Sequence, residues 1–255
     1  FDAALRRALL PPGGPAIDFA QPAGEPALAS PDSISWQVFK NPLALYVGGI
    51  AAVILEFAHA AVRTGVWDHT SFRTDPRTRV QRTGLAALMT VYGPRSRTEV
   101  MIAAVNRRHG QVVGMTPDGS PYRASDPTLL DWVHATAGYG IREAYSNYVR
   151  PLTTAEADRF TAEGLESARL YGATGAPASA HECAALFACM FPALEASPIV
   201  FEFLALMQRA PLLPRPLVPV QRMLVRAAVE LVPQDIRARL DLDESWNLPG
   251  WQRRL

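Results

Sequence analysis

Helix-start signals divide this chain, and they constrain its fold more than any other feature of the sequence. In each signal, a side chain that caps helices stands directly before a proline or about three residues before a glutamate. No segment shows the sustained alternation of apolar and polar residues that is typical of a half-buried strand. The sequence therefore predicts an all-α fold, a helical bundle. The four signals are Asp75-Pro76, Ser96 with Glu99, Asp126-Pro127, and Thr153 or Thr154 with Glu156.

The apolar periodicity between these signals predicts the positions of the helices. We expect a Pro/Gly-rich arm over residues 1–32, with a short amphipathic piece over 3–10, and one helical domain over 33–255. A turn at Pro117-Asp118-Gly119 precedes a short extended piece around Tyr122. The expected helices cover a short segment after Ser33, then residues 43–64, 76–92, 96–113, 128–149, 153–172, 180–194, 198–209 and 219–232, with helical turns from 233 onward.

Residues 42–61 form the one stretch that is apolar enough to be considered as a membrane span. Glu56 and His59 lie toward its end, and Gly48-Gly49 interrupt it. Because a charged group inside a bilayer is costly, we expect a buried helix here and no integral membrane span. No signal peptide is visible in this sequence, and we expect a cytoplasmic protein.

Charge and cysteine content argue against several classes of function. With 25 Lys+Arg and 24 Asp+Glu residues the formal net charge is +1, which does not indicate nucleic acid or an anionic membrane as the main partner. Lys40 is the only lysine, which argues against a Schiff-base enzyme. Cys183 and Cys189 are too few for a disulfide framework, and we expect two reduced, buried thiols.

Two segments carry side chains suited to a haem pocket. Arg79, Arg82 and Thr83 have the spacing that places them on one face of a helix. His109 and His134 each lie on the apolar stripe of a later helix. A haem needs a neutral imidazole for its iron, apolar walls, and cations for its propionates. The alternative is a core histidine that hydrogen-bonds to a carbonyl, and spacing alone does not choose between His109 and His134 as the ligand.

Glu56 and His59 form a Glu-x-x-His unit, and Arg63 continues the same helix face. Di-iron carboxylate bundles use this unit twice, together with two further glutamates. No second unit is present. We therefore favour a structural role, in which Glu56 pairs with Arg63 or orients a pocket residue. The chain also lacks a Gly-rich phosphate loop, a nucleophile elbow and a His-Glu-x-x-His motif.

Read in order, short motifs between residues 43 and 200 resemble a known family. The family is the haem-oxygenase-like superfamily that contains the MpaB oxygenases and the rubber-cleaving latex-clearing proteins, catalogued as DUF2236. Each motif is weak alone, whereas the ordered set is specific. The motifs are Gly48-Gly49, His59-Ala60-Ala61-Val62, Gly65-Val66-Trp67-Asp68-His69-Thr70, Arg79-x-x-Arg82-Thr83, Tyr92-Gly93, His109-Gly110-Gln111-Val112, Tyr122-x-Ala124-x-Asp126-Pro127, Trp132-Val133-His134-Ala135 and Tyr148-x-x-Pro151-Leu152.

The resemblance implies an all-α fold that encloses haem b, and an oxygenase that uses O2 on an apolar, unsaturated or aromatic small molecule. It implies that His109 is the axial iron ligand and that Arg79, Arg82 and Thr83 lie on the opposite side, where O2 binds the iron. The rubber-cleaving members have lysine at the position of Arg82. Arginine stays protonated and is a poor iron ligand, so we expect Arg82 to donate hydrogen bonds to O2 or to the substrate.

The resemblance also suggests roles for three further residues. Glu56 is the nearest candidate for the family's catalytic carboxylate. His59 and His134 are expected near the haem as pocket or propionate partners. Two other functions stay open at this stage: a haem-binding sensor or carrier without turnover, which the missing lysine favours, and a non-haem di-iron enzyme.

Overall fold

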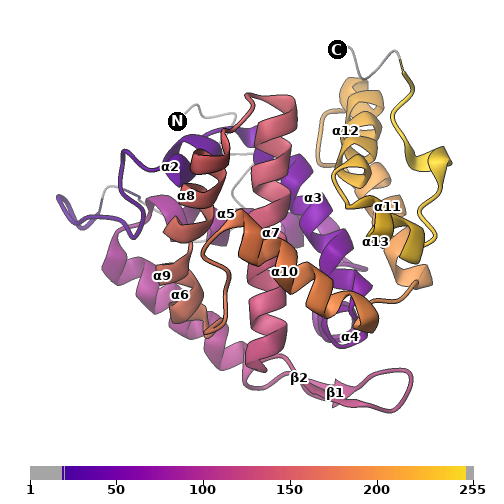
Figure 1. Ribbon diagram of the computed structural model, residues 1–255, viewed down its shortest axis with the longest axis horizontal. Helices are drawn as coiled ribbons and strands as arrows, with labels where there is room; N and C mark the ends of the chain where they lie inside the picture. Colours follow the sequence, from indigo (N-terminus) through magenta and orange to yellow (C-terminus); the bar gives the residue numbers. More distant parts are fainter. Residues whose placement is uncertain (1–18, 20, 251–255) are drawn as a thin grey trace.

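The computed structural model describes residues 19 and 21–250 of the chain (Figure 1). Its only sheet within this range is an antiparallel pair, β1 (Val113–Met115) and β2 (Pro121–Arg123). The all-α prediction is therefore confirmed. The helices are α2 (Ile34–Phe39), α3 (Pro42–Ala58), α4 (Ala60–His69), α5 (Pro76–Tyr92), α6 (Arg95–His109), α7 (Pro127–Tyr148), α8 (Thr154–Glu163), α9 (Leu165–Tyr171), α10 (Ala180–Met190), α11 (Pro198–Arg209), α12 (Val218–Glu230) and α13 (Gln234–Arg239), with 3-10 turns at Phe191–Ala193, Arg215–Leu217 and Glu244–Trp246.

The crossing of α3 and α7 forms the centre of the fold (Figure 1). A Cβ placed on Gly48 would lie 2.5 Å from the Cα of Ile141, and one on Gly140 would lie 2.4 Å from the carbonyl oxygen of Gly48. The two backbones therefore touch without side chains between them. On other sides α3 packs against α11 and α12, and Phe57 of α3 is buried against Phe203 of α11.

Three of the four predicted helix starts are confirmed. The carboxylates of Asp75 and Asp126 accept hydrogen bonds from the backbone amides of the first turns of α5 and α7, and Thr153 and Glu156 form a capping box at α8. The prediction for Ser96 is wrong. Helix α6 begins one residue earlier, after Pro94, and the Ser96 amide and hydroxyl donate instead to the carboxylate of Glu25.

Each of two predicted helices is divided into two helices in the structure. The predicted segment 43–64 divides at His59, which has extended backbone angles and forms a β-bridge with Leu194. The amide of Glu195 also donates to the carbonyl of Ala58 at 2.9 Å. The predicted helix 153–172 divides at Gly164, between α8 and α9. The break at His59 coincides with these long-range contacts, which local periodicity does not report.

Burial corrects the prediction for the cysteines. Cys183 is buried as expected, whereas Cys189 is exposed on α10, and both are free thiols. The predicted amphipathic piece at 3–10 lies outside the described residues. Among the helices of the described chain, none has the length and apolarity to cross a membrane. The stretch 42–61, which we expected to be a buried helix, contains the largely buried helix α3.

Helices α5 and α6 lie apart from this core. The close neighbours of α5 are α2 and α6, and those of α6 are α5 and α9, whereas α3 packs closely on neither of them. Only four residues of α5 are buried although the helix has 17: Gln81, Leu88, Met89 and Val91. The predicted site residues Arg79, Arg82 and His109 lie on these two helices, where Arg79 and His109 are partly buried and Arg82 is exposed.

Candidate functional site

One stripe of the apolar helix α3 remains partly uncovered. Tyr46, Gly49, Val53 and Glu56 follow one another at helical spacing, and all four are half-buried, whereas the neighbouring faces of α3 are fully buried. A Cβ on Gly49 would have no atom within 4 Å. Within the described residues, the buried hydroxyl of Tyr46 has no hydrogen-bond partner. The stripe thus offers open space, an apolar surface and a polar group at each end.

Glu56 carries the chemically unusual group of this stripe. Burial raises the pKa of its carboxyl to about 7, although the positive charge of Arg79 opposes the rise. Its carboxylate forms no hydrogen bond or ion pair within the described residues. Near neutral pH this carboxyl therefore populates both protonation states, which is the condition for accepting and returning a proton.

Arg79 of α5 links Glu56 to the next helix. Burial lowers the pKa of its guanidinium, the charge of Glu56 raises it, and it stays cationic. Its Nη1 donates to the hydroxyl of Thr83 at 2.7 Å, and that hydroxyl donates to the Arg79 carbonyl at 2.9 Å. The buried Nε of Arg79 has no partner among the residues that the structure describes. The guanidinium also lies 5.3 Å from the ring of Phe72. Thr83 and Phe72 thereby restrict its position.

His109, the last residue of α6, is the third member of this group. Burial lowers the pKa of its imidazole, and the charge of Arg79 lowers it further. The ring is therefore neutral at pH 7, and its buried Nδ1 has no hydrogen-bond partner in the part of the chain that the structure describes. The charge of Arg79 shifts the pKa of both Glu56 and His109, so its guanidinium lies within electrostatic range of both side chains. We call these three residues the Glu56–Arg79–His109 cluster.

Two predicted site residues on α5 lie nearer the surface. Arg82 and Thr83 are both exposed. Thr83 joins the cluster through its two hydrogen bonds with Arg79. Arg82 forms no hydrogen bond within the described chain, and its charge acts on Asp75 and Arg79.

The other two histidines of the prediction lie outside the cluster. His59 separates α3 from α4, and its buried Nδ1 has no partner in residues 19 and 21–250. Burial and then the charge of Arg63 lower its pKa, against the charges of Glu195 and Asp126. His134 of α7 faces the α8–α9 junction, where its Nε2 would lie 3.1 Å from a Cβ on Gly164. Burial lowers its pKa to about 4, and no charge of the cluster contributes.

A comparison with protein-family models shows to which family this chain belongs. One model matches residues 36–255, and its description is ER-bound oxygenase mpaB/B'/Rubber oxygenase, catalytic domain. The chain belongs to this family. The match includes every predicted site residue, and it confirms the predicted resemblance to the MpaB and rubber oxygenases. Comparisons with curated proteins and with solved structures found no match.

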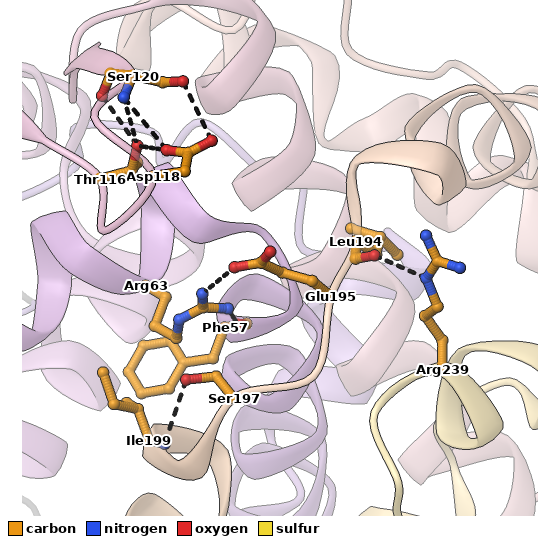
Figure 2. A network of polar contacts seen from close by, with 10 residues as sticks. All are labelled: Phe57, Arg63, Thr116, Asp118, Ser120, Leu194, Glu195, Ser197, Ile199 and Arg239. Atoms are coloured by element: carbon orange, nitrogen blue, oxygen red, sulfur yellow. Dashed lines mark hydrogen bonds and ion pairs between the residues drawn. The ribbon is translucent and has the colours of Figure 1, made fainter.

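One predicted contact near the site is wrong in this MpaB/rubber-oxygenase chain. Arg63 does not pair with Glu56. Its guanidinium is buried in α4, where Nη1 donates to the carbonyl of Phe57 at 2.8 Å and Nη2 forms an ion pair with Glu195 (Figure 2). Glu195 follows Leu194 in the connection to α11, which Arg239 also holds through the Leu194 carbonyl. This connection fixes the junction between Glu56 and His59, and no sequence spacing indicated it.

For this oxygenase-family chain we compare two kinds of iron site, a di-iron centre and a haem iron, which need different protein ligands. Among the described residues, no group of three or more His, Cys, Asp or Glu side chains is close enough to hold a metal ion. A carboxylate-bridged di-iron centre needs such a group, whereas a haem iron needs a single protein imidazole. A cavity of about 620 Å³ between α7 and the α12–α13 region, which Tyr139, Glu143 and Arg237 help to line, contains none of the predicted site residues.

Proposed function

We propose that this protein is a haem b-dependent oxygenase that uses O2 to oxidise an apolar, unsaturated or aromatic small molecule. The Glu56–Arg79–His109 cluster carries the proposal. It combines a neutral imidazole, a fixed cation and a carboxyl that titrates near neutral pH, all next to a partly uncovered apolar stripe. Membership in an oxygenase family supports the reaction type.

The unpaired polar atoms support the fit of a haem to this site. Across the described chain, the Nδ1 of His109, the Nε of Arg79 and the hydroxyl of Tyr46 are buried without partners. Each such atom costs about 1–3 kcal/mol when it stays unpaired, so a polar ligand that reaches them stabilises the fold. A haem b has a metal for the imidazole, propionates for cations and hydroxyls, and an apolar ring for the α3 stripe.

Each of these residues has its own role in the proposed reaction. His109 would hold the iron through its neutral ring, and Arg79 is the cation available to a propionate or to negative charge that develops on oxygen. When bound, haem supplies the redox-active centre that amino-acid side chains lack. Glu56 accepts or returns a proton at its carboxyl oxygen. Val53 and the open space at Gly49 would receive an apolar substrate.

Absorption spectroscopy of the purified chain tests the cofactor. Titration with haemin should give a Soret band in the wild type and in His181→Ala, because His181 is an exposed residue of α10 and serves as a matched control. His109→Ala should lose or shift this band. The proposal is wrong if the wild type does not bind haemin, or if His109→Ala binds it with an unchanged spectrum.

A haem-binding sensor or carrier without turnover is the second candidate. The exposed position of Arg82, in place of the lysine of the rubber-cleaving members, favours it. Oxygen uptake by the haem-loaded protein in the presence of apolar alkenes and arenes separates the two candidates. The oxygenase predicts uptake that Glu56→Gln abolishes and Arg82→Ala reduces, with haem binding retained in both variants, whereas the sensor or carrier predicts no uptake at all.

A further inference from the structure

The end of α6 carries two polar side chains on one face of the helix. Asn106 and His109 are three residues apart, a spacing that places their Cβ atoms about 5–6 Å from each other. Arg107 and Arg108, which stand between them in the sequence, are exposed, whereas Asn106 and His109 are both partly buried. The helix face that carries the proposed iron ligand therefore also carries an amide.

The amide of Asn106 is held in one orientation. Helix α6 runs beside α9 (Figure 1), and the Nδ2 of Asn106 donates to the carbonyl oxygen of Leu170 in α9 at 2.7 Å. A reversed amide would place two oxygens against each other, so this bond identifies which amide atom is the oxygen. That oxygen, Oδ1, is buried and has no hydrogen-bond partner among the described residues. A buried acceptor in this state destabilises the fold until a donor reaches it.

The imidazole of His109 lacks the complementary partner. Because the ring is neutral, one of its nitrogens carries a hydrogen and the other has a free lone pair. Nδ1 is buried without a partner in the described chain, whereas Nε2, which forms no hydrogen bond there either, is not fully buried. Nε2 is therefore the nitrogen that a metal can reach, and the hydrogen belongs on Nδ1. The ring then has a buried donor one helical turn from the buried acceptor of Asn106.

We propose that Asn106 is a positioning residue for the axial ligand, and that its Oδ1 accepts a hydrogen bond from Nδ1 of His109 when Nε2 of that ring binds the haem iron. The inference rests on the proposed function, since it concerns the ligand of the same haem. No hydrogen bond joins the two side chains in the structure, but residues one turn apart are within reach of such a bond. Metal-binding histidines almost always donate their second ring N–H to a neighbouring acceptor, which fixes the ring and makes the metal-bound nitrogen more basic. The bond to Leu170 keeps the acceptor in place, so α9 supports a ligand that α6 carries.

Haemin titration and resonance Raman spectroscopy of the haem-loaded full chain test the proposal. Asn106→Leu removes the acceptor from a side chain of similar size, so the haemin affinity should fall about 10–100-fold and the iron–histidine stretching frequency of the ferrous protein should fall. Asn106→Asp supplies a stronger acceptor, so the stretching frequency should rise and the reduction potential of the iron should fall. Asn147→Leu is the matched control, because the Nδ2 of Asn147 also donates to a backbone carbonyl, at 2.9 Å, beside a cavity that contains none of the site residues. It should behave as the wild type does.

A purely structural role for Asn106 predicts a different pattern. Both variants lose the donor to Leu170, so a residue that only ties α6 to α9 should shift the iron–histidine stretch in the same direction in both, or in neither. Either result would overturn the proposal. If Asn106→Leu does not fold, the direction of the shift in Asn106→Asp decides alone. A wild type that does not bind haemin would refute the proposed function and this inference with it, whereas unshifted spectra in haem-loaded variants would refute only the role of Asn106.

Discussion

Replacement of Glu56 by glutamine tests the electrostatic description of the site without any cofactor. The carboxyl of Glu56 titrates near 4.5 in an unfolded chain and near 7 in the fold, because burial outweighs the opposing charge of Arg79. Between these two pH values the folded protein binds more protons than the unfolded chain. The free energy of unfolding of the wild type therefore falls as the pH rises through this interval.

The size of the effect follows from the same two values. A rise in pKa from 4.5 to about 7 corresponds to about 3 kcal/mol, at about 1.4 kcal/mol for each tenfold change in proton affinity. Below pH 4.5 both states are protonated and the wild type shows no penalty. Above about pH 7 the penalty is complete. Glu56→Gln has no proton to lose, so it should be more stable than the wild type by up to about 3 kcal/mol at high pH and equally stable at low pH.

Urea unfolding of the apoprotein, followed by far-UV circular dichroism across this pH range, measures the difference. Glu202→Gln, which changes an exposed carboxylate of α11, is the control and should follow the wild type at every pH. The reasoning fails if the stability difference between Glu56→Gln and the wild type does not change with pH. It also fails if the wild type is the more stable protein at high pH.

Two further changes test the packing around the site. Gly48→Ala places a methyl group 2.5 Å from the Cα of Ile141 and should lower the free energy of unfolding by about 2 kcal/mol or more, whereas Gly49→Ala meets no atom within 4 Å and should raise it by about 0.5–1 kcal/mol. Equal thermal shifts for the two variants would contradict the α3–α7 contact. Arg63→Met leaves the Phe57 carbonyl without its donor and should cost about 1–3 kcal/mol in urea unfolding; an unchanged midpoint would show that this buried guanidinium does not stabilise the junction.

Local chemistry made most helix starts predictable. Asp75-Pro76 and Asp126-Pro127 cap α5 and α7 as the sequence indicates, because cap and proline act within one turn. Ser96 carries the same kind of signal, yet its side chain bonds to Glu25, which lies far away along the chain. Competition of this kind comes from tertiary contacts, so no local pattern reveals it.

The candidate site was predictable in part. The spacing of Arg79 and Thr83 correctly placed them together, since both lie on one face of α5. The choice between His109 and His134 could not be made from spacing, because each lies on an apolar stripe. In the structure the two histidines have different surroundings, which depend on long-range packing. The charge of Arg79 lowers the pKa of His109, whereas His134 faces Gly164. The role of Tyr46 was also not predicted, since an aromatic residue on an apolar helix is usually part of the core.

The contact between Gly48 and Gly140 fixes the separation of α3 and α7, so any change in the shape of the site has to come from other helices. Helices whose backbones meet directly have no side chains to repack, so a ligand of another size cannot be accommodated by spreading α3 from α7. Any expansion must come from α5 and α6, which carry Arg79 and His109 and have few close neighbours. Engineering of the proposed oxygenase toward bulkier molecules should therefore begin on those two helices and leave the glycine crossing untouched.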